Sequence, residues 1–403
     1  MIHTFKKGRR SVFCLIIILF IFSHQAFPQT TQPNLRIHAQ SAVLMDALSG
    51  QVLYEKNPRS KIGPASFVKI LTLYLALDIL RDGHLKRDDW VTVSEKAWKT
   101  GGSRMFIKVG ERVKVEDLLK GIGVVSGNDA SVALAEHIAG SEGFFVLEMN
   151  KKAQLLGLKD SQFKNPHGLP ARDQFTTAFD TAILVRHYIK DHPEALALHS
   201  TTEFEYSGIR QQNRNILLKK NIGVDGLMTG HVEESGYHLV ATAKRDRQRM
   251  IAVVMGCDKL QKRYRDAETL LEYGFKNFST VGAVKLGALF GPQKVVRGKL
   301  NKVHLTPAQE GWVTVAKGKE NSISVTPEVP KFIAAPIQKG QVVGKLVIQS
   351  EGEILKEIAL LSSSDVPKGF YLLWPLIGGG VIGLLLVSLI IYLRFRRLRR
   401  VKF

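Results

Sequence analysis

Hydrophobic positions are densest in one long run that follows a turn of small residues. Across residues 70–80 nearly every side chain is apolar; the run has no period-two alternation and is too long for an ordinary strand. A helix that is apolar on most sides belongs in the middle of a large domain. Pro64 suits its first turn, and Gly83 suits its end. The pattern therefore predicts a buried central helix whose first turn carries Ser66 and Lys69 on one face.

Around this helix, the pattern predicts a strand pair, several helices, further strands and a last helix. Alternating runs over 42–46 and 51–55 predict a β-hairpin. Strands at both ends of the segment predict an α+β domain over residues 36–280, in which helices flank an antiparallel sheet. The other helical runs are 115–122, 131–138, 144–156, 177–189 and 264–275, and the other strand-like runs are 90–93, 203–206, 209–217, 224–231 and the antiparallel neighbours 237–245 and 249–256.

From about residue 282 the chain changes to short alternating pieces punctuated by glycine and proline. This texture predicts a small all-β sandwich domain over residues 282–362 and a linker over 363–369. Residues 370–393 carry no charge, and a run of about 20 apolar residues is enough to cross a bilayer, so they predict a C-terminal transmembrane helix. The basic residues within 394–403 predict a cytoplasmic tail.

The start of the chain predicts export. Residues 1–26 combine a basic start with a short apolar core, which is typical of a secretory signal peptide; retention as an uncleaved anchor is the alternative. Together with the predicted C-terminal helix, this indicates a single-pass protein of the cell inner (cytoplasmic) membrane whose folded domains lie in the periplasm or extracytoplasmic space.

Composition excludes several functional classes. The formal net charge is +21, but four basic residues precede the first apolar run and six follow the last one. The remaining excess is not organised into a nucleic-acid recognition motif, so we expect no nucleic-acid partner. Of the two cysteines, Cys14 lies in the predicted signal and Cys257 would be a single thiol. No Cys/His cluster has metal-ligand spacing, so we expect neither metal nor cofactor.

Ser66 and Lys69 have the spacing of a nucleophile and its base. A serine hydroxyl attacks only when a base takes its proton, and a buried lysine can be that base because a low-dielectric environment favours its neutral form. Backbone N–H groups at the start of a helix also suit a developing oxyanion. The alternative is a plain N-terminal helix serine beside a surface lysine, so the pair needs partners.

Two further motifs supply such partners. Ser126 and Asn128 lie on a tight turn between predicted helices, where a hydroxyl can pass a proton to a leaving amine and an amide can hold a substrate carbonyl. Thr229 and Gly230 lie on a predicted edge strand, where the glycine lets a ligand approach the backbone. These motifs, S-x-x-K, S-x-N and x-T-G, occur in the same order as the S-x-x-K, S-D-N and K-T-G motifs of class A β-lactamases and penicillin-binding proteins.

With these motifs the chain resembles the low-molecular-mass penicillin-binding proteins, the serine-type D-alanyl-D-alanine carboxypeptidases. The likeness runs from about residue 42 through the β domain. It implies a serine β-lactamase/DD-peptidase-like domain, the β-sandwich and a membrane anchor, with peptidoglycan stem peptides and β-lactam antibiotics as ligands. The stretches that carry it are 63–70, 126–130, 165–169, 212–215, 224–231 and 236–241.

By this resemblance, Ser66 is the acylated nucleophile, Lys69 its base and Ser126 the third catalytic group. The backbone N–H groups of Ser66 and His231 are expected to form the oxyanion hole. The other residues expected to bind substrate are Asn128, Arg214, Met228, Thr229 and Gly230.

Met228 departs from the family pattern, in which the third motif begins with lysine. That lysine is a cation aimed at the substrate carboxylate, and its charge helps to keep the base lysine neutral. The leading hypothesis is a carboxypeptidase that removes the terminal D-alanine through an acyl-enzyme. The alternatives are a DD-endopeptidase, or a catalytically weakened wall-binding homologue in which Met228 has impaired the site.

Overall fold

The structure is a computed structural model that describes residues 35–369 and 374–399. The predicted signal peptide at 1–26 lies outside the described residues, as do positions 370–373 of the predicted membrane helix and 400–403 of the predicted tail.

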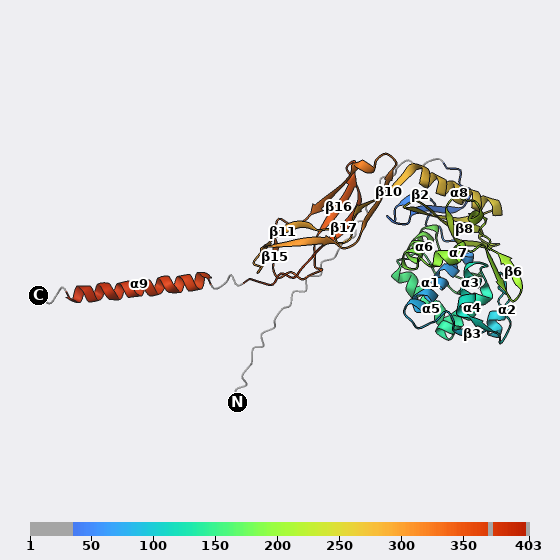
Figure 1. Cartoon of the computed structure of the whole chain (residues 1–403), viewed down its shortest axis with the longest axis horizontal. Helices are drawn as coiled ribbons and strands as arrows, with labels where there is room; N and C mark the ends of the chain where they lie inside the picture. Colours follow the sequence, from blue (N-terminus) through green and yellow to red (C-terminus); the bar gives the residue numbers. More distant parts are fainter. Residues whose placement is uncertain (1–34, 370–373, 400–403) are drawn as a thin grey trace, which may run out of the picture. The chain divides into compact units, whose positions relative to one another are not determined.

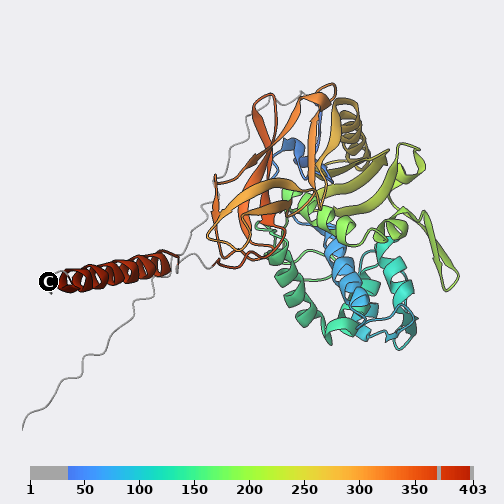
Figure 2. The same cartoon turned by 60° about the vertical axis from the view of Figure 1, so that its left-hand side comes forward.

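The first domain is built on a five-stranded sheet in the order β2-β1-β9-β8-β7, antiparallel throughout. Its strands come from both ends of the domain, as the sequence predicts, and β7 is an edge strand. Helix α8 (Leu260–Asn277) covers one face and the other helices lie on the opposite face (Figures 1 and 2). The strands are β1 (Ser41–Asp46), β2 (Val52–Lys56), β7 (Val224–Val232), β8 (Gly236–Arg245) and β9 (Gln248–Cys257).

The apolar run forms the central helix α1 (Val68–Arg81), whose residues from Val68 to Tyr74 are all buried. The prediction was wrong about its start, because Ser66 lies in a separate 3-10 turn, η1 (Ala65–Phe67), that leads into α1. Ala65 has a φ of +47°, a left-handed conformation that a continuous α-helix does not contain. The predicted end is confirmed, since Gly83 follows α1 with a φ of +78°.

Smaller elements surround this core. The predicted strand over 209–217 is shorter than expected, because β6 ends at Gln212 and Asn215 caps a 3-10 turn, η2 (Ile216–Lys219). Helices α2 and α7 and strand β4 are short elements that the hydrophobic pattern did not predict. The remaining elements are β3 (Trp90–Thr92), α2 (Glu95–Lys99), β4 (Arg112–Lys114), α3 (Val115–Gly123), α4 (Asn128–Ala139), α5 (Glu142–Leu155), α6 (Ala178–Asp191), α7 (Ala195–Ser200), β5 (Glu203–Tyr206) and β6 (Ile209–Gln212).

The second domain is all β, as predicted. A six-stranded sheet in the order β14-β16-β17-β12-β11-β15 and a two-stranded ribbon β10-β13 share one apolar core, which includes Val313 and Leu346. The elements are β10 (Phe278–Val284), β11 (Phe290–Val296), β12 (Lys302–Pro307), β13 (Gly311–Ala316), η3 (Glu320–Ser322), β14 (Ile323–Glu328), β15 (Ile333–Ala334), β16 (Val342–Ser350) and β17 (Glu353–Ser362).

The last element is helix α9 (Trp374–Arg399). Within residues 35–369 and 374–399, no helix qualifies by length and apolar character as one that could cross a membrane.

Candidate active site

The structure brings Ser66 and Lys69 together at the start of α1. Lys69 Nζ lies 3.1 Å from Ser66 Oγ and donates a hydrogen bond of 2.5 Å to the backbone carbonyl of His167. Because that carbonyl orients the amine, the remaining lone pair of a neutral Lys69 can face the serine hydroxyl. The 3-10 turn places Ser66 so that its side chain is half-buried while Lys69 is fully buried.

The environment of Lys69 favours its neutral form. Burial and, to a smaller extent, the positive charge of Arg214 lower the pKa of Lys69 to about 7, against a smaller opposing effect of Asp129. A general base is most effective when its pKa is near the working pH. At neutral pH a large fraction of the molecules therefore carries a lysine able to accept the proton of Ser66.

The second motif lies on a strained turn beside the nucleophile. Ser126 has a φ of +60°, and its hydroxyl donates a 2.9 Å hydrogen bond to Ser66 Oγ. Asn128 starts helix α4, with its backbone N–H bound to Ser103 O and its side-chain amide bound to Gly101 O, each at 2.7 Å. A residue other than glycine rarely has a φ near +60°, and it keeps this backbone conformation only where the surrounding structure fixes it.

Asp129 is the residue that fixes this turn, and the sequence analysis gave it no role. Its buried carboxylate accepts hydrogen bonds from the backbone N–H groups of Met105, Phe106 and Ala130 at 2.9–3.0 Å. A carboxylate with three N–H donors is well compensated for burial. Asp129 thereby ties the 101–106 loop to the Ser126 turn.

Two glycines allow backbones to close around the nucleophile. A Cβ atom at Gly230 would lie 3.0 Å from Ala65 Cβ, which shows how closely β7 passes the turn that carries Ser66. Gly168 has a φ of +88°, and a Cβ there would lie 1.8 Å from Ala65 O. No other residue type fits such a position without displacing the backbone before Ser66. A Cβ at Gly230 would also lie 3.4 Å from the backbone nitrogen of Ser66, so the strand that carries His231 passes close to that N–H group.

Behind β7 lies a buried cation that the sequence analysis also missed. The guanidinium of Arg263, on α8, donates to Gly230 O at 3.0 Å and to the hydroxyl of Tyr264 at 2.7 Å, while that hydroxyl donates to Arg214 O at 2.6 Å. Arg263 is 4% exposed, and its Nε atom has no partner among the described residues. The arginine therefore links the backbone of the third motif to the segment that carries Arg214. The only sequence signal was a basic residue on the helix face that also carries Ala267 and Leu270.

His238 fixes the backbone before the nucleophile. Its Nδ1 atom accepts a hydrogen bond from Gly256 N–H at 2.9 Å, so the proton is on Nε2, which lies 3.0 Å from Gly63 O. Burial lowers the pKa of His238 to about 4, which keeps the ring neutral at physiological pH. This side chain thus links Gly63, just before the nucleophile, to strands β8 and β9.

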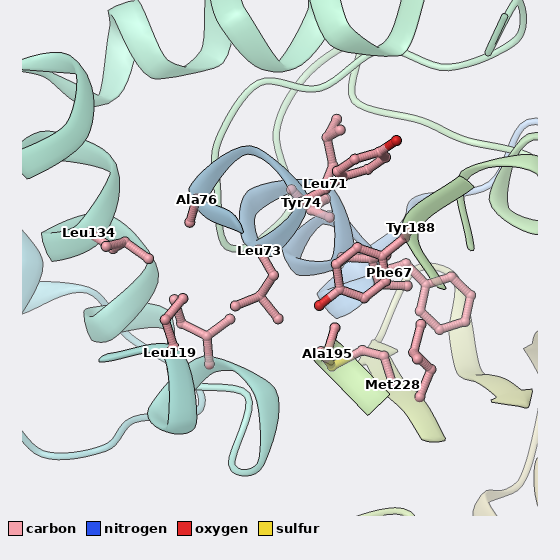
Figure 3. Packing of buried hydrophobic residues seen from close by; sticks show 14 of the residues in the cluster. Phe67, Leu71, Leu73, Tyr74, Ala76, Leu119, Leu134, Tyr188, Ala195 and Met228 are labelled. Atoms are coloured by element: carbon pink, nitrogen blue, oxygen red, sulfur yellow. The ribbon is translucent and has the colours of Figure 1, made fainter. Parts of the chain in front are cut away.

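Met228 does not offer a polar group to the site. Its side chain is 3% exposed and belongs to the hydrophobic cluster around α1 that also contains Phe67, Tyr188 and Ala195 (Figure 3). Arg214 is exposed, and its positive charge lowers the pKa of Lys69. A positive charge from a different segment thus acts on Lys69, although Met228 brings none to the site.

The comparisons with known proteins identify the family. Residues 27–259 match the D-alanyl-D-alanine carboxypeptidase family, and residues 278–368 match the C-terminal domain of penicillin-binding protein 5. The chain belongs to the D-alanyl-D-alanine carboxypeptidase family. It is 40% identical over 361 residues to D-alanyl-D-alanine carboxypeptidase DacC of Escherichia coli (strain K12), an alignment that covers 87% of this chain and 90% of the relative.

Solved structures agree with this assignment. Penicillin-binding protein 5 from Haemophilus influenzae matches with a TM-score of 0.80 and 40% identity, over 83% of this chain and 99% of that one. Penicillin-binding protein D2 from Listeria monocytogenes, in its ampicillin-bound form, matches with a TM-score of 0.56 and 30% identity, over 60% of this chain and 100% of that one.

These findings confirm the predicted family and the predicted enzyme class, a serine-type D-alanyl-D-alanine carboxypeptidase. They also confirm the DD-peptidase fold with a following β domain, and peptidoglycan and β-lactams as the ligand classes of the family. The roles of individual site residues stay predictions.

Proposed function

We propose that this carboxypeptidase removes the terminal D-alanine of peptidoglycan stem peptides through an acyl-enzyme on Ser66. The single observation that supports this most strongly is the cluster of Ser66, a buried Lys69 and Ser126, with Lys69 Nζ 3.1 Å and Ser126 Oγ 2.9 Å from Ser66 Oγ. Such a cluster contains a nucleophile, a base with a pKa of about 7 and a hydroxyl for proton relay.

In the first half of the proposed reaction, Lys69 takes the proton of Ser66 as its oxygen attacks the carbonyl of the penultimate D-alanine. The oxyanion is stabilised by the N–H groups of Ser66 and His231. As the peptide bond breaks, Ser126 gives its proton to the departing D-alanine amine and regains one from Lys69. In the second half, water attacks the ester, Lys69 takes a proton from that water, and Ser66 is released with its hydroxyl restored.

The substrate is proposed to be held at its terminal carboxylate by Thr229 and Arg214, and along its acyl part by Asn128. Arg214 takes the place of the missing lysine in this scheme, both as the cation for the carboxylate and as the like charge that keeps Lys69 neutral. This argues against a weakened wall-binding homologue, because the electrostatic condition for catalysis is still met. A DD-endopeptidase would use the same groups on a cross-linked stem.

Release of free D-alanine tests this proposal. Purified full-length protein is incubated with an N-acetylated peptide ending in D-Ala-D-Ala and, in parallel, with a cross-linked stem dimer. We expect one D-alanine per uncross-linked peptide and slower cleavage of the dimer. If the dimer were the faster substrate, the protein would be an endopeptidase, and if neither were cleaved, the wall-binding alternative would hold.

We also propose that the protein is exported and attached to the cell inner membrane by its C-terminal segment. The support is the uncharged run 370–393 followed by basic residues, and the exposed apolar side chains along α9, such as Leu384 and Ile390. The catalytic and β domains would then lie in the periplasm.

Truncation after Pro367 checks the attachment. We expect the truncated protein in the soluble periplasmic fraction, and the full-length protein in membranes that resist a salt wash, because apolar burial is not screened by salt. A truncated protein that stays in the washed membranes would contradict the proposal, since the β domain or an uncleaved N-terminal segment would then be the anchor.

A further inference from the structure

The chain leaves the β domain through three segments that lie side by side. The turn between β11 and β12 is tied to the last residues of the domain, because Lys299 N–H donates to Pro367 O and Gly369 N–H donates to Arg297 O, each at 2.9 Å. Strand β15 pairs in parallel with the last residues of β11, at the end of the domain from which the chain leaves (Figure 1). These segments together are called the exit surface, and they are residues 294–302, 331–334 and 366–369.

The exit surface is basic and contains no acidic residue. Its basic residues are all exposed, and they are Lys294, Arg297, Lys299, Lys302, Lys331 and Lys368. Within the described residues, the ion pairs of the β domain join other side chains, namely those of Lys319, Lys345, Glu328, Glu351 and Glu357. The carboxylate of Asp365, just before the last segment, accepts a 2.8 Å hydrogen bond from the backbone N–H of Lys339. The positive charge of the exit surface is therefore not neutralised by the fold.

Two of these charges face each other across a strand pair. Lys294 on β11 and Lys302 on β12 are direct partners in the antiparallel register. Both are exposed, while Gln293 and Val295 on either side of Lys294 are buried, so the two lysines share the outer face of the sheet. Like charges in directly opposite positions destabilise a strand pair. An anionic partner that binds both lysines removes this repulsion.

The same end of the domain exposes two large apolar side chains. Leu300, in the turn between β11 and β12, is 50% exposed, and Phe332, just before β15, is 59% exposed. Apolar side chains among unpaired cations suit the surface of a bilayer, where they enter the headgroup region while the cations pair with anionic headgroups. The chain also continues from Gly369 directly into the uncharged run 370–393. The proposed membrane anchor therefore begins within one residue of the exit surface.

We propose that the exit surface is a docking site for an anionic bilayer, distinct from the anchor that follows it. The inference rests on the proposed attachment of the chain to the membrane. It adds that the β domain itself contacts the headgroups, through its cations and through Leu300 and Phe332. A basic patch alone binds a bilayer reversibly and is released by salt, so this contact supplements the anchor and does not replace it.

Acetylation of lysines tests this contact in the full-length protein. The protein is incorporated into vesicles of phosphatidylcholine alone or of phosphatidylcholine with phosphatidylglycerol, treated briefly with an amine-reactive acetyl ester, and analysed by mass spectrometry. Each basic residue near an anionic surface contributes about fivefold in binding, so we expect acetylation of Lys299 and Lys302 to fall at least about fivefold in the anionic vesicles. High salt should abolish this protection. Lys285 and Lys317, exposed lysines of the same domain outside the exit surface, should react equally in both.

A double variant assigns the protection to the exit surface. Lys294→Gln with Lys302→Gln should weaken docking about 25-fold and restore acetylation of Lys299, because two cations are lost. Lys285→Gln with Lys317→Gln changes the net charge equally and should leave Lys299 protected. Protein that fails to float with either kind of vesicle would overturn the proposed attachment. Protein that floats, but whose Lys299 reacts equally in neutral and anionic vesicles, would overturn this inference alone. Protection in neutral vesicles that grows with protein density would also overturn it, since a second copy would then cover the surface.

Discussion

Replacing Lys69 by methionine lowers the rate of Ser66 acylation by about a hundred- to ten-thousandfold, the usual contribution of a positioned general base. Methionine has nearly the same length as lysine and no charge, so it fills the fully buried site, although the backbone carbonyl of His167 loses its donor. The measurement is the acylation rate with a fluorescent penicillin, with thermal unfolding as the control for folding. A Lys69→Met protein that folds and acylates within tenfold of the wild type would show that another group is the base.

The wild-type pH profile follows from the same residue. Lys69 must be neutral to accept a proton, and its pKa is lowered to about 7, so kcat/KM should rise with pH and reach half its plateau at about pH 7. Below that pH the ammonium form predominates and activity is lost. A lysine with an ordinary pKa would place this limb more than three pH units higher.

Arg214→Ala is expected to lower kcat/KM about ten- to a hundredfold, because it removes both a charge-assisted contact to the substrate carboxylate and a like charge near Lys69. The acid limb should also move to higher pH, since Lys69 then holds its proton more tightly. Met228→Lys should do the opposite: it should raise kcat/KM and move the limb to lower pH, by restoring the cation of the family motif.

The double variant separates the two cations. If Arg214 has taken over from the missing lysine, Arg214→Ala costs far more in the wild-type background than in the Met228→Lys background. Met228→Gln, uncharged and of similar size, is the control for disturbing the apolar cluster that contains Met228. Additive effects of Arg214→Ala and Met228→Lys, or a pH limb that moves in neither variant, would contradict the substitution of one cation by the other.

Long, strongly patterned elements could be predicted from the sequence. The apolar run predicted α1, because a helix that is apolar on most sides is buried at the centre of a domain. Two strand-like runs joined by a basic turn predicted the antiparallel pair β8 and β9. The start of α1 was missed because the left-handed backbone of Ala65 depends on tertiary contacts, namely the close approach of Gly168, and has no local signal.

The candidate site divides in the same way. Ser66, Lys69 and Ser126 could be predicted as site residues because a nucleophile, a base and a proton relay require specific residue types, and the motifs that contain them follow one another in a fixed order along the chain. Asp129 and Arg263 were not, because their contacts join segments distant in sequence, as in the hydrogen bond from Arg263 to Gly230 O. The position of Met228 in the apolar cluster could not be predicted from the sequence, since a methionine on an edge strand can equally line a substrate site.

Covalent labelling of Ser66 is the measurement that tests the central claim most directly. The full-length protein is treated with penicillin, digested, and analysed by mass spectrometry for the peptide that contains Ser66. We predict one penicilloyl adduct per chain on Ser66, none in Ser66→Ala, and slow loss of the adduct as water resolves the ester. An intact protein without an adduct, under conditions that label another member of the family, would contradict catalysis at this serine.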